Sequence, residues 1–380
     1  MSILINKNVL SKGWKTFYIM HKERRVASIR EDGTATVYYP SFMPYNLWLE
    51  KAEPTDFDTK LSNLGNFYYW CASRVLTLDR KYAKEIMNSI GAAQASTDKE
   101  RALIAISYHA LSLTDVYWVK NISEKISFDD INLFNHSLSG AFSDVSLKGI
   151  QLTAENSELI DPSDAAGDVA TDGVAPKAWI KENGKFYLLK DGDVRDVEAE
   201  LLASKIIDCF RIDHVSYERA EFDDKAVTKS EIITSPDRSI VSAQYIDIYC
   251  SNHSIDREKL VLSKDAYSYH MMNIVDYLVG NTDRHWANWG FMVDNNTNKI
   301  VKLYPLMDYN KSFLSYDTIE GARCLTTSSG VSQRKAAEKG VAAVGLNQIS
   351  EIDPSLFKNE NIKEMFFKRL DILKEFANKW

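Results

Sequence analysis

The sequence has little of the residues and patterns that mark several protein classes. Its 380 residues include only 16 glycines and 8 prolines, which excludes a collagen-like or linker-rich chain. Four cysteines, at positions 71, 209, 250 and 324, are widely separated, so we expect reduced thiols rather than a disulfide framework or a C-x-x-C metal site. No run approaches 18 apolar residues, and the N-terminus has no apolar signal segment. The sequence therefore predicts a soluble, cytoplasmic protein that does not bind membranes.

An excess of positive charge is also missing. The 46 Lys and Arg residues against 53 Asp and Glu residues give a net charge of −7 at pH 7. An acidic chain is a poor candidate for non-specific nucleic-acid binding, so we expect no direct binding to DNA or RNA. Hydrophobic residues make up 45% and charged residues 26%, which is ordinary for globular proteins and excludes wholesale disorder.

The N-terminal region, residues 1–140, is predicted to be a mixed accessory domain. Alternating residues at 26–39 predict a hairpin. Helical spacing at 61–76 and 98–113 predicts two helices, and a capping residue near Thr97 is expected to start the second.

The remainder is predicted to consist of a β-rich part, residues 141–250, and a mainly helical part, residues 251–380. The first part is predicted to contain a loop (161–176), strands (177–180 and 186–190), a helix (194–210) and two more strands (231–234 and 240–246). The second part is helical except for one hairpin (289–303), and it ends in an amphipathic helix (361–380). The fold class is therefore α+β.

The segment 280–290, Gly-Asn-Thr-Asp-Arg-His-Trp-Ala-Asn-Trp-Gly, carries the main chemical signal. Phosphoryl transfer from ATP needs a carboxylate near the acceptor hydroxyl and an oxygen ligand for Mg²⁺, and protein kinases supply these from an Asp and an Asn separated by four residues. Asp283 and Asn288 have that spacing. Arg284 is expected to be a structural ion-pair partner, and His285 is expected to brace the loop.

A second metal ligand is expected from the hairpin that follows. Asn288 lies just before its first strand, and Asp308 lies just after its second. Two antiparallel strands joined by one turn bring their outer ends together, so these side chains should meet. Oxygen donors of this kind suit Mg²⁺.

A phosphate-binding region is predicted upstream. Backbone N–H groups of a loop could line phosphates, and the loop consists of Thr171, Asp172, Gly173 and Val174. Lys190 ends a predicted strand and is the candidate for contacting the phosphates, with Lys177 as a second candidate. The following helix offers Glu198 and Glu200 as partners for the lysine, and periodicity does not choose between them.

The sequence at this point resembles the HipA-like serine/threonine kinases of bacteria, whose fold is related to the phosphoinositide kinases. The resemblance rests on the Asn-Thr-Asp-Arg-His-x-x-Asn run and the Pro-Leu-x-Asp run about twenty residues later. Ala-Pro-Lys-Ala at 175–178 and Glu-Leu-Leu-Ala-Ser-Lys at 200–205 add to it. It covers roughly residues 140–380 and implies a two-lobed kinase core, with a small β-rich N-lobe and a mainly helical C-lobe.

The resemblance also implies site roles. Asp283 would be the general base, and Asn288 and Asp308 would hold Mg²⁺. Lys190 would contact the ATP phosphates, with Glu200 favoured over Glu198. The implied nucleotide site further includes Lys177, His285 and the 171–174 loop, with Gln244 and Tyr245 nearest the adenine.

These observations lead to the hypothesis of an ATP- and Mg²⁺-dependent kinase that phosphorylates a Ser or Thr hydroxyl of a protein. The chain itself is a possible substrate, at Thr171 or within 326–329, and a regulatory protein is a possible partner. One alternative is a lipid or small-alcohol kinase, for which a basic loop near 311–334 would argue. The other is a nucleotide-binding regulator without turnover, which retained ATP binding in the absence of transfer would favour.

Overall fold

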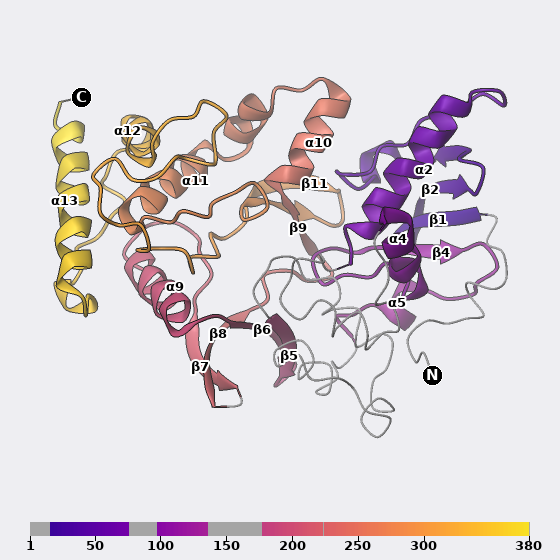
Figure 1. Cartoon of the computed structure of the whole chain (residues 1–380). Coiled ribbons are helices and arrows are strands. Elements are labelled where there is room, and N and C mark those ends of the chain that lie inside the picture. Colours follow the sequence, from indigo (N-terminus) through magenta and orange to yellow (C-terminus); the bar gives the residue numbers. More distant parts are fainter. Residues whose placement is uncertain (1–15, 76–96, 136–176, 223, 380) are drawn as a thin grey trace. The chain divides into compact units, whose positions relative to one another are not determined.

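The computed structural model describes residues 16–75, 97–135, 177–222 and 224–379 (Figure 1). The chain divides into two compact units. The first unit is Met1–Lys190 with Thr234–Ser239 and Asp294–Lys299, and the second is Asp191–Ile233 with Ile240–Val293 and Ile300–Trp380. The predicted division at residues 140 and 250 stays a prediction, and its first boundary lies outside the described residues.

The first unit contains a four-stranded antiparallel sheet with the strand order β3-β2-β1-β4. Its described elements are β1 (Thr16–His21), β2 (Arg24–Arg30), β3 (Ala35–Val37), η1 (Pro40–Phe42), α2 (Phe57–Ala72), α4 (Asp98–Ser107), β4 (Tyr117–Asn121) and α5 (Phe128–Ile131). Helix α2 packs on this sheet through aromatic side chains: the rings of Phe67 and Phe17 lie 5.3 Å apart, and Trp70 meets Tyr117 edge-on. The hairpin predicted at 26–39 is confirmed as β2–β3.

Side-chain caps fix where these helices begin. The Thr97 hydroxyl accepts a hydrogen bond from the Glu100 N–H, and the Glu100 side chain accepts one from the Thr97 N–H, which confirms the predicted capping start of α4. The helix ends at Ser107, earlier than predicted, because His109 and Ala110 adopt left-handed backbone conformations with φ of 61° and 51°.

The first unit also contains the hairpin β5 (Lys177–Glu182) and β6 (Lys185–Asp191), which confirms the strands predicted at 177–190. Its turn, Asn183-Gly184, has positive φ at both residues, the conformation that a two-residue hairpin turn favours. In this register Lys177 lies directly opposite Lys190.

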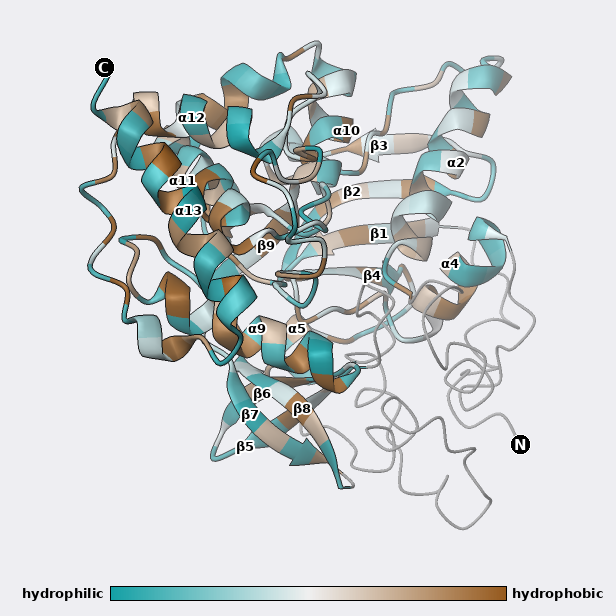
Figure 2. Cartoon of the chain, turned by 60° about the vertical axis from the view of Figure 1, so that its left-hand side comes forward, coloured by the Kyte–Doolittle hydropathy of each residue, from teal (hydrophilic) through white to brown (hydrophobic). Residues whose placement is uncertain are grey.

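The second unit is built around a long helix, α11 (Arg257–Val279), in which every residue from 269 to 279 is buried. Its other elements, which lie in it wholly or for most of their length, are α9 (Val194–Ile207), β7 (Glu218–Phe222), β8 (Lys225–Glu231), β9 (Arg238–Ser242), α10 (Ala243–His253), β10 (Gly290–Asp294), β11 (Lys299–Leu303), α12 (Gln333–Val344), η2 (Pro354–Leu356) and α13 (Glu360–Ala377). Helices α12 and α13 pack against α11. Figure 2 shows polar and apolar residues alternating along α13, and the predicted apolar face is buried at Phe366, Leu370 and Leu373.

Two predicted strands are wrong in their bounds. The strand predicted at 231–234 is wrong except at Glu231, the last residue of β8, and the hairpin of β7 and β8 was not predicted. The strand predicted at 240–246 ends at Ser242, because the Ser242 hydroxyl accepts the Tyr245 N–H and starts α10. The β-branched and aromatic residues of this stretch favour a strand, and one capping hydroxyl starts a helix instead.

One further predicted hairpin is confirmed, and the cysteines are reduced as expected. The hairpin predicted at 289–303 is β10–β11, and the three-stranded sheet has the order β11-β10-β9. All four cysteines are free thiols, and those at 71, 250 and 324 are buried. Among the described residues, no helix is both long enough and apolar enough to span a bilayer.

Candidate active site

The candidate site begins where α11 ends. Gly280 has φ of +63°, and its N–H group closes the helix on the Asp276 carbonyl. A Cβ atom at this position would lie 2.5 Å from a ring carbon of Tyr316, so only glycine fits both the conformation and the space. The chain therefore turns sharply after α11 and enters the loop of residues 281–288, which we call the catalytic loop.

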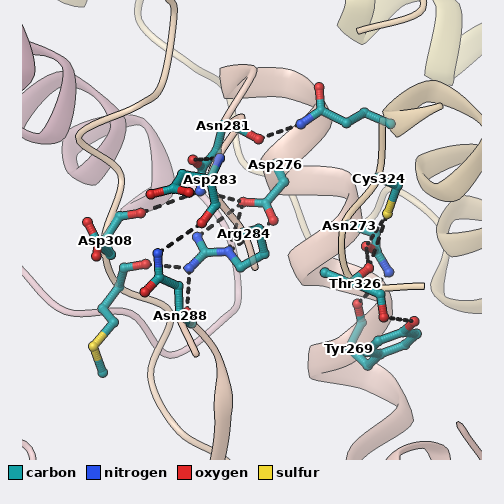
Figure 3. A network of polar contacts seen from close by, with 12 residues as sticks. Tyr269, Asn273, Asp276, Asn281, Asp283, Arg284, Asn288, Asp308, Cys324 and Thr326 are labelled. Carbon is teal, nitrogen blue, oxygen red and sulfur yellow. Dashed lines mark hydrogen bonds and ion pairs between the residues drawn. The ribbon is translucent and has the colours of Figure 1, made fainter. Parts of the chain in front are cut away.

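Asn281 connects three parts of the site through one side chain (Figure 3). Its Oδ1 accepts the backbone N–H of Asp283 at 3.1 Å. Its Nδ2 donates to Asp276 Oδ1 at 3.3 Å and to the Asp308 carbonyl at 3.4 Å. Asn281 thus ties the backbone of the candidate base to α11 and to the backbone of the candidate metal ligand.

Arg284 makes the second connection. Its Nε donates to Asp276 Oδ2 at 3.0 Å and its Nη2 to Oδ1 at 3.1 Å, which confirms the predicted ion-pair role. Its Nη1 donates to the carbonyls of Asn288, at 2.8 Å, and Met307. One guanidinium nitrogen therefore holds together the chain segments that carry Asn288 and Asp308.

The electrostatics of the pair follow from its burial. Desolvation by burial lowers the pKa of the Arg284 guanidinium, but the groups around it, Asp276 first among them, together raise that pKa overall. Burial raises the pKa of the Asp276 carboxyl, and Arg284 acts in the opposite direction. Each charge is therefore tolerated in the interior only because the other is present.

Asn288 lies against Asp283. Its Nδ2 donates to the Asp283 carbonyl at 2.9 Å, so its Oδ1 is left as the acceptor end of the amide. The Asp283 side chain is 42% exposed and can meet a substrate. His285 Nε2 lies 3.7 Å from Asp283 Oδ1, and its Nδ1 accepts the Ala287 N–H. This contact is in keeping with the expected bracing role.

Asp308 is held in a strained conformation. Its φ is +61°, which is uncommon for a residue other than glycine. Its N–H donates to the Tyr217 hydroxyl at 3.1 Å, and the preceding Leu306 carbonyl accepts the Val215 N–H at 2.8 Å. Figure 3 shows Asp283, Asn288 and Asp308 gathered on one side of the Asp276–Arg284 pair. The geometry brings together the three residues that the sequence selected.

The donor set fits a hard divalent cation. An amide oxygen at Asn288 and a carboxylate at Asp308 are ligands that Mg²⁺ accepts, and Mg²⁺ usually takes one or two carboxylates together with substrate phosphates. In the described part of the chain, no cluster of three or more His, Cys, Asp or Glu side chains could enclose a metal. An amide oxygen and one carboxylate are thus suited to a metal that takes its other ligands from elsewhere.

The two candidate glutamates on α9 differ sharply. Glu200 is 1% exposed; its Oε2 accepts the Thr228 hydroxyl at 2.7 Å and its Oε1 the Tyr309 N–H at 3.3 Å. Glu198 is 43% exposed and pairs with Arg219. Glu200 is therefore the inward-facing residue, beside the segment that follows Asp308.

The predicted nucleotide-binding residues lie in different parts of the chain. Lys177 and Lys190 belong to the first unit, and the catalytic loop belongs to the second. Gln244 and Tyr245 lie in the first turn of α10, where the Gln244 N–H donates to the Trp286 carbonyl of the catalytic loop at 2.9 Å. The loop of Thr171, Asp172, Gly173 and Val174 lies outside the described residues. The nucleotide-binding roles of all these residues stay predictions.

Sequence reasoning missed Asp276, Asn281 and Tyr217 as site residues. Asp276 did leave a signal, because it interrupts an apolar run that is otherwise suited to a buried helix. A charged residue in the middle of a buried helix needs a partner, and Arg284 lies eight residues later. Asn281 and Tyr217 left no such signal, because their roles depend on contacts across the fold.

No protein-family model and no curated protein sequence matches the chain. Among solved structures, the chain is similar to HipA in the complex of the Shewanella oneidensis MR-1 toxin–antitoxin proteins HipA and HipB with their operator DNA. The sequence identity is 11%, the TM-score is 0.50, and the match covers 95% of this chain and 99% of that chain. The chain has a HipA-like kinase fold.

A second similar structure is the Helicobacter pylori proinflammatory kinase CtkA. It shares 15% sequence identity at a TM-score of 0.39, over 53% of this chain and 93% of that chain. The match to HipA extends over nearly the whole chain, whereas the sequence resemblance covers only residues from about 140 onward. The α+β fold class with a two-lobed kinase core is therefore confirmed at the level of the fold.

Proposed function

We propose that this protein is an ATP- and Mg²⁺-dependent kinase that transfers the γ-phosphoryl group to a Ser or Thr hydroxyl of a protein. The observation that carries the proposal is the buried network of Asp276, Asn281 and Arg284. It holds the backbones of Asp283 and Asn288 and the segment carrying Asp308 in one arrangement. Phosphoryl transfer depends mainly on positioning and charge stabilisation, and this network provides positioning.

Asp283 is the proposed base. Its backbone is fixed through Asn281 and through Asn288, while its carboxylate is exposed enough to accept a hydrogen bond from an acceptor hydroxyl. The hydroxyl oxygen forms the new bond to phosphorus, the bond to the ADP oxygen breaks, and the hydroxyl proton passes to Asp283. When bound to Asn288 and Asp308, Mg²⁺ would supply charge neutralisation on the phosphates.

The proposed nucleotide-binding residues are those that the sequence selected. Lys190 would contact the phosphates, with Lys177 nearby on the paired strand and the 171–174 loop lining them. The burial of Glu200 supports it over Glu198 as the residue that orients the lysine. Gln244 and Tyr245 would lie nearest the adenine.

The alternative of a lipid or small-alcohol kinase has less support. It relied on basic side chains near 311–334, but most of these Lys and Arg side chains are paired with carboxylates. Lys311 pairs with Asp196 at 2.6 Å, and Arg334 and Lys335 both pair with Glu338, at 2.9 and 3.2 Å. Paired cations leave little net charge to attract an anionic headgroup.

A regulatory protein partner is part of the proposal. The Shewanella oneidensis HipA chain was solved together with HipB and operator DNA. The likeness to that chain at the level of the fold is the support for a partner here, and it names neither the partner nor the phosphorylated substrate.

The test is incubation of the full chain with γ-labelled ATP and Mg²⁺ in the presence of a generic protein substrate, with intact-mass analysis of the chain itself. Wild type should transfer label, Asp283→Asn should lose transfer at least about 100-fold, and EDTA should abolish it. The matched control is Asp371→Asn, which changes an exposed carboxylate on α13 and should leave transfer intact.

The other outcomes separate the alternatives. Mg²⁺-dependent thermal stabilisation by ATP without transfer to protein would favour a regulator without turnover, and transfer to a lipid headgroup alone would favour the lipid kinase. A wild-type chain that neither binds ATP nor transfers label contradicts the proposal altogether.

A further inference from the structure

Residues 321–333 form a closed loop beside the catalytic loop, and we call this segment the brace. The Cys324 N–H donates to the Val331 carbonyl at 2.9 Å, and the Gln333 N–H donates to the Ala322 carbonyl at 2.8 Å. An isolated antiparallel bridge joins Arg323 to Ser332. The brace contains residues 326–329, which the sequence analysis named as a possible phosphorylation site, and the proposed catalytic roles do not use it.

One end of the brace holds the start of the catalytic loop. Gln333 is buried, and its Nε2 donates to the Asn281 carbonyl while its Oε1 accepts the Ala322 N–H at 3.0 Å. A Cβ atom at Gly321 would lie 2.6 Å from this Oε1, so the backbone is packed directly on the amide. The Gln333 amide therefore links the Ala322 backbone, at one end of the brace, to the Asn281 backbone in the catalytic loop.

The middle of the brace holds the other part of the catalytic loop. The Leu325 carbonyl accepts the indole N–H of Trp286 at 2.9 Å. The Trp286 ring is covered by the Arg257 guanidinium, whose carbon lies 3.4 Å from the ring centroid. Asp283, the proposed base, lies between the two residues that the brace contacts. It follows Asn281 by two residues and precedes Trp286 by three.

The brace is itself anchored on α11 (Figure 3). The Thr326 hydroxyl donates to Asn273 Oδ1 at 2.6 Å, and Cys324 Sγ donates to the same oxygen at 3.6 Å. The Tyr269 hydroxyl donates to the Thr326 carbonyl at 3.4 Å. Asn273 and Thr326 are both buried, and Asn273 lies three residues before Asp276 on the helix that fixes the catalytic loop.

The space between brace, helix and catalytic loop is nearly filled. The polar cavity bounded by Asn273, Asp276, Arg284 and Thr326 has a volume of about 10 Å³, which is the size of one water molecule at most. A shift of the brace toward α11 or the catalytic loop therefore has no empty space to enter and would displace packed side chains.

We infer that the brace is a positioning element for the catalytic loop, with Thr326 and Gln333 as its positioning residues. Neither side chain needs to touch the substrate. Thr326 fixes the brace on α11 through its hydrogen bond to Asn273. Gln333 and the Leu325 carbonyl then hold Asn281 and Trp286, which lie before and after Asp283 in the chain. The catalytic part of this inference rests on the proposed kinase function. That the brace holds the catalytic loop in position does not depend on that function.

The first test measures the loop without any turnover. Hydrogen–deuterium exchange is followed on peptides covering residues 281–288 in Thr326→Val, Thr326→Ser and Thr327→Val. Valine keeps the shape of threonine but removes the hydroxyl, so exchange of the loop should rise roughly tenfold, the effect of losing about one hydrogen bond. Serine restores the hydroxyl and should restore wild-type exchange. Thr327→Val is the matched control, because the Thr327 hydroxyl meets Ser329 and not Asn273.

The second test measures transfer. Thr326→Val and Gln333→Leu should lower kcat by roughly tenfold to 100-fold and leave the KM for ATP within about twofold, because the loop is displaced while the nucleotide site is kept. Thr326→Ser should recover most of kcat.

Each outcome decides the inference. Unchanged loop exchange in both Thr326→Val and Gln333→Leu overturns it, as does equal exchange in Thr326→Val and Thr327→Val. If wild type transfers no phosphate, the kinase proposal fails, and the exchange difference between the valine and serine variants still decides the role of the brace. If Thr326→Val fails to fold, Gln333→Leu supplies the same exchange comparison.

Discussion

The Asp276 carboxylate accepts hydrogen bonds from both Nε and Nη2 of Arg284, at 3.0 and 3.1 Å, in the buried interior of the second unit. The remaining nitrogen of Arg284 reaches the two chain segments that carry Asn288 and Asp308. An ion pair of this kind adds little to stability relative to apolar residues of the same size, but it fixes geometry in a way that apolar residues do not. Fixed geometry of this kind is what the proposed phosphoryl transfer would use.

Breaking this pair from one side should be costly. Arg284→Met leaves the Asp276 carboxyl buried without a cation, and we expect a loss of about 3–5 kcal/mol in the free energy of unfolding, measured by urea denaturation. The double variant Asp276→Leu/Arg284→Met removes both charges and should be less destabilised than the sum of the single variants.

The control for this experiment is an exposed ion pair. Lys339 Nζ lies 3.3 Å from Glu258 Oε1 with both side chains more than half exposed, so Lys339→Met should change stability by less than about 1 kcal/mol. Equal effects of Arg284→Met and Lys339→Met would contradict the structural role of the buried pair.

Asn298, in the turn between β10 and β11, should stabilise the first unit. Its Nδ2 donates to the carbonyls of Ser41 and Met43 at 3.0 and 3.1 Å, and its Oδ1 accepts the Tyr117 hydroxyl at 3.0 Å. Asn298→Ala removes the three hydrogen bonds of this buried side chain, and we expect a loss of about 3 kcal/mol in the free energy of unfolding.

Two further variants separate the causes of this loss. The φ of Asn298 is +54°, so Asn298→Gly removes the same bonds without the strain that alanine adds and should be the milder change. Asn296→Ala, at an exposed position of the same turn, should be nearly neutral. Similar urea midpoints for Asn296→Ala and Asn298→Ala would rule out a role for the buried amide.

His21 should make stability depend on pH. Burial lowers the pKa of its imidazole from 6.5 to about 4, with Asp115 acting in the opposite direction. The neutral ring is packed between the rings of Phe42 and Tyr117. The unfolded chain binds a proton below pH 6.5, and the folded chain does so only near pH 4, so stability falls as the pH drops through this window.

The full loss over that window is about 3 kcal/mol, since one pKa unit corresponds to about 1.4 kcal/mol. His21→Phe should flatten the pH dependence of the urea midpoint between pH 6.5 and 4. The matched control is His253→Gln, an exposed histidine at the end of α10, which should keep the wild-type slope. A slope unchanged in His21→Phe would show that other groups dominate this pH range.

The sequence by itself determined the features whose signals are local. The spacing of Asp283 and Asn288, the hairpin between Asn288 and Asp308, and the capping start of α4 all depend on residues a few positions apart or on one turn. Such features are encoded in backbone preferences and short-range hydrogen bonds, which the sequence displays directly. The α+β class was predicted from the local patterns and the HipA-like fold from the resemblance of the sequence runs, and both are confirmed at the level of the fold.

Only the tertiary structure decided which residues complete the site. Glu200 and Glu198 are equivalent by periodicity, and they differ because Glu200 meets Thr228 and the Tyr309 backbone. Asp276 and Asn281 gain their roles from partners that the folded chain brings into contact, and the same holds for the brace on Asn273. The physical reason is that a buried polar group is stable only with a partner, and the choice of partner depends on how distant segments pack.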